Sequence, residues 1–210
     1  MEPADELKAR LAQCPLVAII RGVTLDEAEA TGAAILEAGI RIVEVPLNSP
    51  DPLRSIELLA RKFGDSALIG AGTVLDPGDV ARVRDAGGRV IVSPNMFEPV
   101  IATAAAAGLV SLPGFFTPSE GFAAIRAGAT GLKLFPAEGA SPAVVKAMRA
   151  VLPRELPVIV VGGVAPDTMR PWTEAGADGF GLGSGLYKPG QPAAETAEKA
   201  RAYVAGLSAR

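Results

Sequence analysis

Residues 158–186 read VIVVGGVAPDTMRPWTEAGADGFGLGSGL. One sequence pattern occurs once in full in this stretch and then starts again. A short β-branched run, Val158 to Val161, precedes a glycine loop and a segment whose apolar residues have helical spacing. A second apolar run, Gly179 to Leu182, starts the unit again. Ala175-Gly176 stands just before this run, where glycine permits the left-handed end of a helix. The stretch therefore predicts strand, loop, helix and strand in succession.

The same unit recurs along the whole chain. The other apolar runs that predict strands are Leu16 to Ile20, Ile40 to Val45, Ala67 to Ala71, Val90 to Val92, Leu109 to Leu112 and Gly131 to Phe135. Further Ala-Gly pairs precede strands at 38–39, 86–87, 107–108 and 127–128. Helix starts are indicated at Thr24 with Glu27, Asp76-Pro77, Thr117-Pro118 with Glu120, Ser141-Pro142 and Pro166-Asp167.

Eight such units predict an α/β fold of the (β/α)₈ TIM-barrel type, as a single domain over residues 1–210. An extra helix, about Asp5 to Ala12, is expected before the first strand. An open doubly wound sheet is the alternative, but the first strand is followed by Ile20-Arg21-Gly22-Val23 and not by Gly-x-Gly-x-x-Gly. In a barrel, catalytic groups project from the C-terminal ends of the strands.

Composition excludes several classes of function. The net charge of −3 comes from interspersed acidic and basic residues, so we expect no nucleic-acid partner and no membrane partner. The N-terminal residues lack a leader pattern, and a cytoplasmic protein is expected. A single cysteine, Cys14, allows no internal disulfide. The absence of histidine excludes Ser-His-Asp and Cys-His nucleophile systems and the usual zinc ligand sets.

Lys133 is the best clue to chemistry because it lies inside an apolar run near the end of the sixth predicted strand. Burial disfavours the ammonium form, and a neutral amine can form a Schiff base with a carbonyl. Glu44 stands near the end of the second strand, where a carboxyl group poised by burial can move protons. The two residues either form a structural ion pair or carry out imine chemistry, and their positions at strand ends favour catalysis.

Two glycine-containing loops predict an anion site. Val161-Gly162-Gly163-Val164 follows the seventh strand, and Gly181 to Leu186, which includes Gly183 and Ser184, follows the eighth. Backbone N–H groups in such loops can approach an anion closely, and these two loops often hold phosphate in barrels. We therefore expect a phosphate-bearing ligand.

Arg21 and Thr73 follow the first and third strands. Either residue can hold a substrate carboxylate or hydroxyl, Arg21 as a charge-assisted donor and Thr73 as a neutral one. Alternatively, Arg21 forms a surface salt bridge and Thr73 caps its strand. Asn48 and Ser49, just beyond Glu44, either bind substrate hydroxyls or form the turn before Pro50.

Several motifs together, in this order, resemble the KDPG/KHG aldolase family over nearly the whole chain. They are Glu44-Val45-Pro46-Leu47-Asn48-Ser49-Pro50, Gly70-Ala71-Gly72-Thr73-Val74, Val92-Ser93-Pro94-Asn95, Leu112-Pro113-Gly114, Leu132-Lys133-Leu134-Phe135-Pro136, Gly162-Gly163-Val164 and Gly183-Ser184-Gly185-Leu186. The resemblance implies a lysine-dependent aldolase, without metal or other cofactor, that cleaves a phosphorylated 2-keto-3-deoxy sugar acid into pyruvate and glyceraldehyde 3-phosphate.

The resemblance also implies residue roles. Lys133 would be the Schiff-base lysine and Glu44 the proton-transfer residue. Thr73 would lie near the pyruvate moiety, and Arg21 would contribute to substrate binding. The substrate phosphate would lie on three residues: Gly163, Gly183 and Ser184. Family members are commonly trimers, so a homotrimer is expected.

Four positions depart from the gluconate-type members of the family. Those members typically read Glu-Val-Thr-Leu-Arg-Thr after the glutamate and carry threonine before the glycine pair, whereas this chain has Pro46, Asn48, Ser49 and Val161. The pattern resembles the branch that acts on the C4 epimer, 2-dehydro-3-deoxy-6-phosphogalactonate. The alternatives are a gluconate-type aldolase, an isomerase or synthase that uses Lys133 only as a charge, and a non-catalytic sugar-phosphate-binding barrel.

Overall fold

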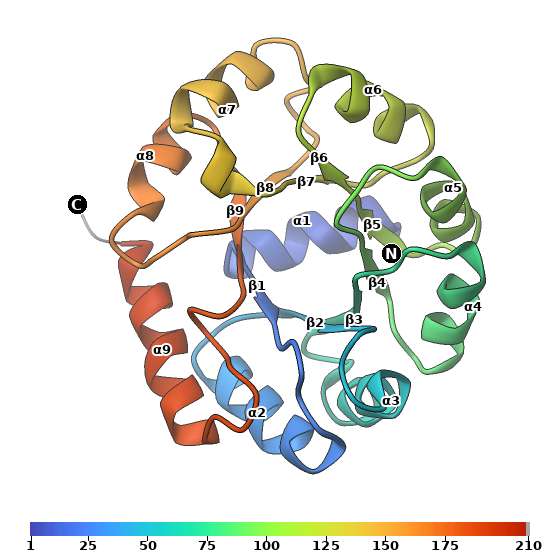
Figure 1. Ribbon diagram of the computed structural model, residues 1–210, viewed down its shortest axis with the longest axis vertical. Helices are drawn as coiled ribbons and strands as arrows, with labels where there is room; N and C mark the ends of the chain where they lie inside the picture. Colours follow the sequence, from blue (N-terminus) through green and yellow to red (C-terminus); the bar gives the residue numbers. More distant parts are fainter. Residues whose placement is uncertain (209–210) are drawn as a thin grey trace.

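A computed structural model describes residues 1–208 as a barrel of parallel strands inside a ring of helices (Figure 1). Every strand pairing among these residues is parallel, and the strands neighbour one another in the order β5-β4-β3-β2-β1-β9-β8-β7-β6. The strands are β1 (Leu16–Ile19), β2 (Ile42–Pro46), β3 (Leu68–Gly72), β4 (Val90–Val92), β5 (Val110–Leu112), β6 (Gly114–Phe115), β7 (Leu132–Leu134), β8 (Val158–Val161) and β9 (Gly179–Leu182).

The barrel closes through a strand that proline interrupts. β5 pairs with β4 and β6 pairs with β7, and only Pro113 separates β5 from β6. Proline has no N–H to donate, but its carbonyl oxygen accepts from the Lys133 N–H at 2.9 Å and continues the ladder. β5 and β6 are thus two parts of one strand, and counted in this way the barrel has eight strands within residues 1–208. The predicted TIM barrel is confirmed, although the sequence prediction ended its fifth strand too early, at Leu112.

The helices alternate with the strands and cover the outside of the barrel (Figure 1). They are α1 (Pro3–Gln13), α2 (Leu25–Glu37), α3 (Pro52–Phe63), α4 (Pro77–Asp85), α5 (Glu98–Ala106), α6 (Pro118–Arg126), α7 (Pro142–Arg149), α8 (Met169–Glu174) and α9 (Ala193–Gly206), with a 3₁₀ turn, η1 (Ala137–Gly139), after β7. Capping boxes at Thr24 and Thr117 begin α2 and α6 as predicted.

One predicted helix start is wrong. The Pro166-Asp167 pair precedes α8, which begins at Met169. The Thr168 N–H donates to the Ala165 carbonyl at 3.0 Å, and the Ala165 N–H donates to Thr168 Oγ1 at 2.9 Å. These bonds form a separate turn over residues 165–168. The Ala-Gly prediction holds, because each of its glycines has positive φ: Gly39, Gly87, Gly108, Gly128 and Gly176.

The predicted N-terminal helix, α1, closes the N-terminal end of the barrel (Figure 1). Leu7 and Leu11 are buried among inward-facing strand residues such as Ile42 and Leu68. Arg89, just before β4, donates to Glu6 Oε1 at 2.6 Å. Burial of each leucine contributes roughly 1.5–3 kcal/mol to folding. Because α1 covers this end, ligands have access from the opposite end, where the strands finish. No helix among residues 1–208 is long and apolar enough to cross a membrane.

Candidate active site

Glu44 and Lys133 both point into the barrel. Along β2, Ile42 packs with the interior cluster and Val43 and Val45 pack with the helices, so strand alternation turns Glu44 inward. Lys133 lies between Leu132 and Leu134, which also pack outward. β2 and β7 lie on opposite sides of the barrel. Three strands, β1, β9 and β8, separate them in one direction, and β3, β4 and the β5–β6 strand separate them in the other.

The environment favours the neutral form of both groups. Glu44 is 1% exposed and Lys133 is 7% exposed, and both line a small internal cavity walled by apolar side chains such as Ile159. Burial lowers the pKa of Lys133; the charge of Glu44 opposes this shift and Arg21 reinforces it. Burial raises the pKa of Glu44, against the charges of Lys133 and Arg21. A less protonated amine is thus more available to attack a carbonyl.

The structural ion pair left open by the sequence is not formed. No Lys133 nitrogen lies within 4.0 Å of a carboxylate oxygen in residues 1–208. Lys133 Nζ instead lies 4.9 Å from the centre of the Phe135 ring. Glu44 Oε2 is buried and has no hydrogen-bond partner among the described residues. An unpartnered buried carboxyl oxygen is costly to keep, and such groups occur at catalytic sites.

Gly72, at the end of β3, makes room for the Glu44 carboxyl group. A Cβ atom on residue 72 would lie 1.2 Å from Glu44 Oε2 and 2.3 Å from its Cδ. The φ angle of Gly72 is not positive, so the reason for glycine here is space and not backbone conformation. The sequence motif had included this glycine without revealing that it contacts Glu44.

A larger cavity of ≈ 560 Å³ opens at the C-terminal end of the barrel. It brings together all but one of the predicted site residues, and the exception, Glu44, lies below it in the internal cavity that also reaches Lys133. The predicted residues that line the larger cavity are Arg21, Thr73, Lys133, Gly163, Gly183 and Ser184. The amine therefore lies where both cavities meet, between the carboxyl group and the space available to a ligand.

Arg21 and Thr73 form one cluster with Asn48. Arg21 donates to Asn48 Oδ1 and, at 3.3 Å, to Thr73 Oγ1. Arg21 makes no salt bridge among residues 1–208, so that alternative is not observed. Thr73 has φ of 56°, a left-handed conformation that is uncommon for threonine and concentrates at functional sites. Ser49 has a structural contact, because its Oγ accepts from the Gly22 N–H at 2.9 Å.

Three residues that sequence reasoning missed also line the larger cavity: Glu138, Lys188 and Tyr203. Glu138 lies in η1, four positions after the end of β7. Its position after a strand could therefore have identified it as a site residue. Lys188 lies shortly after the glycine loop that follows β9, and this position could have identified it as a site residue in the same way. Tyr203 lies in the last helix, far along the chain from any loop of the site, and no local pattern indicates its position.

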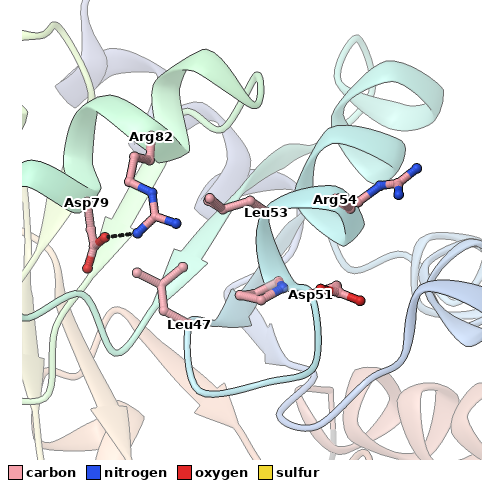
Figure 2. Close-up of a pocket in the computed structure, with 7 residues that line it drawn as sticks. Leu47, Asp51, Leu53, Arg54, Asp79 and Arg82 are labelled. Atoms are coloured by element: carbon pink, nitrogen blue, oxygen red, sulfur yellow. Dashed lines mark hydrogen bonds and ion pairs between the residues drawn. The ribbon is translucent and has the colours of Figure 1, made fainter.

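A cavity of ≈ 400 Å³ lies outside the barrel, between the starts of α3 and α4 (Figure 2). Arg82 and Asp79 form an ion pair there at 2.8 Å, and Leu47, Leu53 and Arg54 are among the other residues that line it. Glu44, Lys133 and the glycine loops do not line it. It therefore lacks the groups that imine chemistry requires.

Comparison with known proteins agrees with this geometry. The model of the KDPG and KHG aldolase family matches residues 7–198. The chain is 48% identical to a probable 2-dehydro-3-deoxy-6-phosphogalactonate aldolase of Rhizobium meliloti (strain 1021), covering 93% of this chain and 92% of the relative. It is 46% identical to the 2-dehydro-3-deoxy-6-phosphogalactonate aldolase of Escherichia coli (strain K12), covering 90% and 93%. A solved structure described as native KDPGal superposes with a TM-score of 0.91 at 45% identity, covering 93% of this chain and 95% of the other. With a buried lysine and carboxyl group facing each other across a closed barrel, this chain belongs to the KDPG and KHG aldolase family.

Proposed function

We propose that the protein is a class I aldolase that cleaves 2-dehydro-3-deoxy-6-phospho-D-galactonate to pyruvate and D-glyceraldehyde 3-phosphate. The observation that carries the proposal is the placement of Lys133, a buried amine with a lowered pKa that opens onto a cavity flanked by glycine loops. The relatives at 46% and 48% identity support the same substrate.

In this mechanism, the neutral Lys133 amine attacks the C2 carbonyl of the substrate. Glu44 moves protons through a bound water as the carbinolamine forms and loses water. The protonated imine accepts the electron pair of the C3–C4 bond when that bond breaks and the C4 hydroxyl loses its proton. Glyceraldehyde 3-phosphate departs, the enamine is protonated at C3, and water hydrolyses the imine to release pyruvate and the amine.

The remaining residues bind the substrate. Thr73 and Arg21 lie beside Lys133 in the cavity and hold the pyruvate end of the substrate by a hydroxyl and a charged donor. Gly163, Gly183 and Ser184 hold the phosphate, since their loops supply backbone N–H groups and a hydroxyl donor. The substrate thus spans the cavity from the amine to the two glycine loops.

Reductive trapping tests the lysine assignment. Borohydride with pyruvate should add one reduced pyruvate to Lys133, located by peptide mass spectrometry. Lys133→Met should give no adduct and no pyruvate release, while Lys146→Met, which changes an exposed lysine of α7, should behave as wild type. An adduct on another lysine, or active protein without an adduct, would show that the imine mechanism is wrong.

The C4 epimer is the finer part of the substrate proposal. Val161 lines the cavity next to the glycine pair, and Asn48 holds Arg21, so two of the positions that depart from the gluconate-type pattern contact the site. We expect faster cleavage of the galactonate epimer than of the gluconate epimer. Equal rates for the two epimers would refute this role for Asn48 and Val161.

The proposal extends to a homotrimer, which the family resemblance supports. Exposed apolar side chains occur on three successive loops after strands: Leu75 at 52%, Phe97 at 42% and Phe116 at 39%. Apolar side chains on neighbouring loops are typical of a subunit interface. Light scattering should give three times the mass of 21.4 kDa, and Phe97→Lys should lower that mass. A monomer in the wild-type protein would contradict the assembly without affecting the chemistry.

A further inference from the structure

Tyr203 reaches the mouth of the barrel from the final helix. It lies on α9, is 4% exposed and lines the same cavity as Lys133 and the two glycine loops. Helices of a barrel normally pack against the outside of the strands, whereas the ring of Tyr203 extends to the loops that end β8 and β9. The side chain therefore has a contact that packing of α9 does not require.

The hydroxyl of Tyr203 joins both glycine loops. It donates to the Val164 carbonyl, in the loop after β8, at 2.9 Å. It also fills the space beside Gly185, in the loop after β9, because a Cβ atom on residue 185 would lie 2.3 Å from the hydroxyl oxygen. The same Cβ would lie 3.8 Å from the Val164 carbonyl oxygen. The two loops and α9 thus meet at one oxygen atom.

The hydroxyl remains a neutral donor under ordinary conditions. Burial raises the pKa of Tyr203 above its usual value of 10.0, and the negative charge of Asp167 adds to the shift. The group consequently brings no charge to the cavity. Its hydrogen bond holds the Val164 carbonyl, and Val164 directly follows Gly163, so the hydroxyl is bonded to the loop that carries the Gly163 N–H group.

We propose that Tyr203 is a positioning residue that holds the loops after β8 and β9 in the arrangement that binds the substrate phosphate. This inference rests on the phosphate assignment of the proposed function. It gives α9 a part in substrate binding, although none of the sequence motifs includes a residue of α9.

Tyr203→Phe removes the hydroxyl and keeps the ring. We expect the Kd for inorganic phosphate, measured by calorimetry, and the KM for the phosphorylated substrate to rise by about threefold to tenfold, as the loss of one hydrogen bond predicts. The value of kcat and the trapping of pyruvate on Lys133 should change by less than about twofold, because kcat is measured at saturating substrate and pyruvate carries no phosphate. Cleavage of the unphosphorylated sugar acid should be equally insensitive.

Gly185→Ala provides the matched test of the same contact. Alone, the added methyl group displaces the hydroxyl and should weaken phosphate binding by a similar factor. In the Tyr203→Phe background it should have little further effect, because the nearest remaining ring atom, Cζ, would lie 3.5 Å from the methyl carbon. Independent, multiplying effects of the two substitutions would overturn the proposal.

The outcomes separate this inference from the proposed function. An unchanged phosphate Kd in Tyr203→Phe overturns the positioning role even if the enzyme is fully active. A parallel loss of phosphate binding, pyruvate trapping and thermal stability also overturns it, because it indicates a merely structural role. Weakened phosphate binding with unchanged trapping supports it. If the wild-type protein releases no pyruvate, the aldolase proposal fails while the phosphate measurements still test Tyr203.

Discussion

Replacement of Gly72 by alanine should disable the Glu44 carboxyl group without touching Glu44 itself. The new methyl carbon would lie 1.2 Å from Glu44 Oε2, whereas an ordinary contact begins at 3.4 Å. The carboxyl oxygen must therefore retreat by about 2 Å. The internal cavity that adjoins the carboxyl group is small and has mostly apolar walls, so it accommodates a displaced carboxyl group poorly.

The expected loss has two parts. A misplacement of about 1 Å can reduce a catalysed rate by about 100-fold, so we expect kcat of Gly72→Ala to fall by about 100-fold or more. Insertion of a methyl group into a filled core typically costs about 1–3 kcal/mol of unfolding free energy. Pyruvate release measures the first part, and urea unfolding at a fixed protein concentration measures the second.

Two further variants show whether the contact with Glu44 is the cause. In a Glu44→Ala background the carboxyl group is absent, and Gly72→Ala should then change the unfolding free energy by no more than about 0.5 kcal/mol. Gly121→Ala, in α6, adds a methyl group to another buried glycine whose nearest neighbours would lie at 3.4 Å, and it should be tolerated. Wild-type kcat in Gly72→Ala, or an equal loss of stability in both backgrounds, would refute the reasoning.

Three other predictions test the charges of the site and a helix cap. Replacement of both interior groups, Lys133→Met with Glu44→Leu, should abolish activity and raise the unfolding free energy, measured in urea, by about 1–4 kcal/mol, because two ionisable groups no longer need desolvation inside the barrel. Arg21→Gln removes a charge that lowers the pKa of Lys133, so the pH midpoint for borohydride trapping with pyruvate should move upward; a downward shift would contradict the electrostatic assignment. Glu120→Ala removes the capping box that begins α6 and should cost about 1 kcal/mol at neutral pH. Hydrogen bonds from the Phe116 and Thr117 backbone and the Thr117 hydroxyl lower the pKa of Glu120 on folding, so its contribution is present above the unfolded value of 4.5 and should disappear as the pH falls through the lowered value.

The fold was predictable because each unit carries its own local signals. Strand alternation alone turns Lys133 and Glu44 inward once the sheet closes, and glycine after alanine marks the helix ends at positions such as Gly39 and Gly176. The extension of the fifth strand past Pro113 was not predictable from local signals. Its continuation depends on the Lys133 N–H, which belongs to a different strand.

The contacts inside the site were less predictable for the same reason. Gly72 stands beside Glu44, and Tyr203 beside Gly185, through packing between segments far apart in the sequence. The bond from Arg21 to Asn48 likewise joins loops after different strands. Sequence patterns indicate which residues lie at the end of a strand. The distances across the mouth of the barrel depend on how all the strands are arranged.

Burial makes the Lys133 amine more reactive, and it also limits how close other charged groups can lie to it. The apolar interior that lowers the pKa of Lys133 raises the pKa of Glu44, so the same desolvation brings an amine and a carboxyl group closer to their neutral forms. If Arg21 were deeper, its charge would lower the pKa of Glu44 more strongly and oppose the effect of burial. Its position at the exposed mouth, bonded to Asn48 and Thr73, keeps it available to the substrate, and its charge is the smallest of the three effects on the pKa of Glu44 and of Lys133. The depth of each charge along the barrel axis, more than its identity alone, therefore separates a binding group from a reacting one.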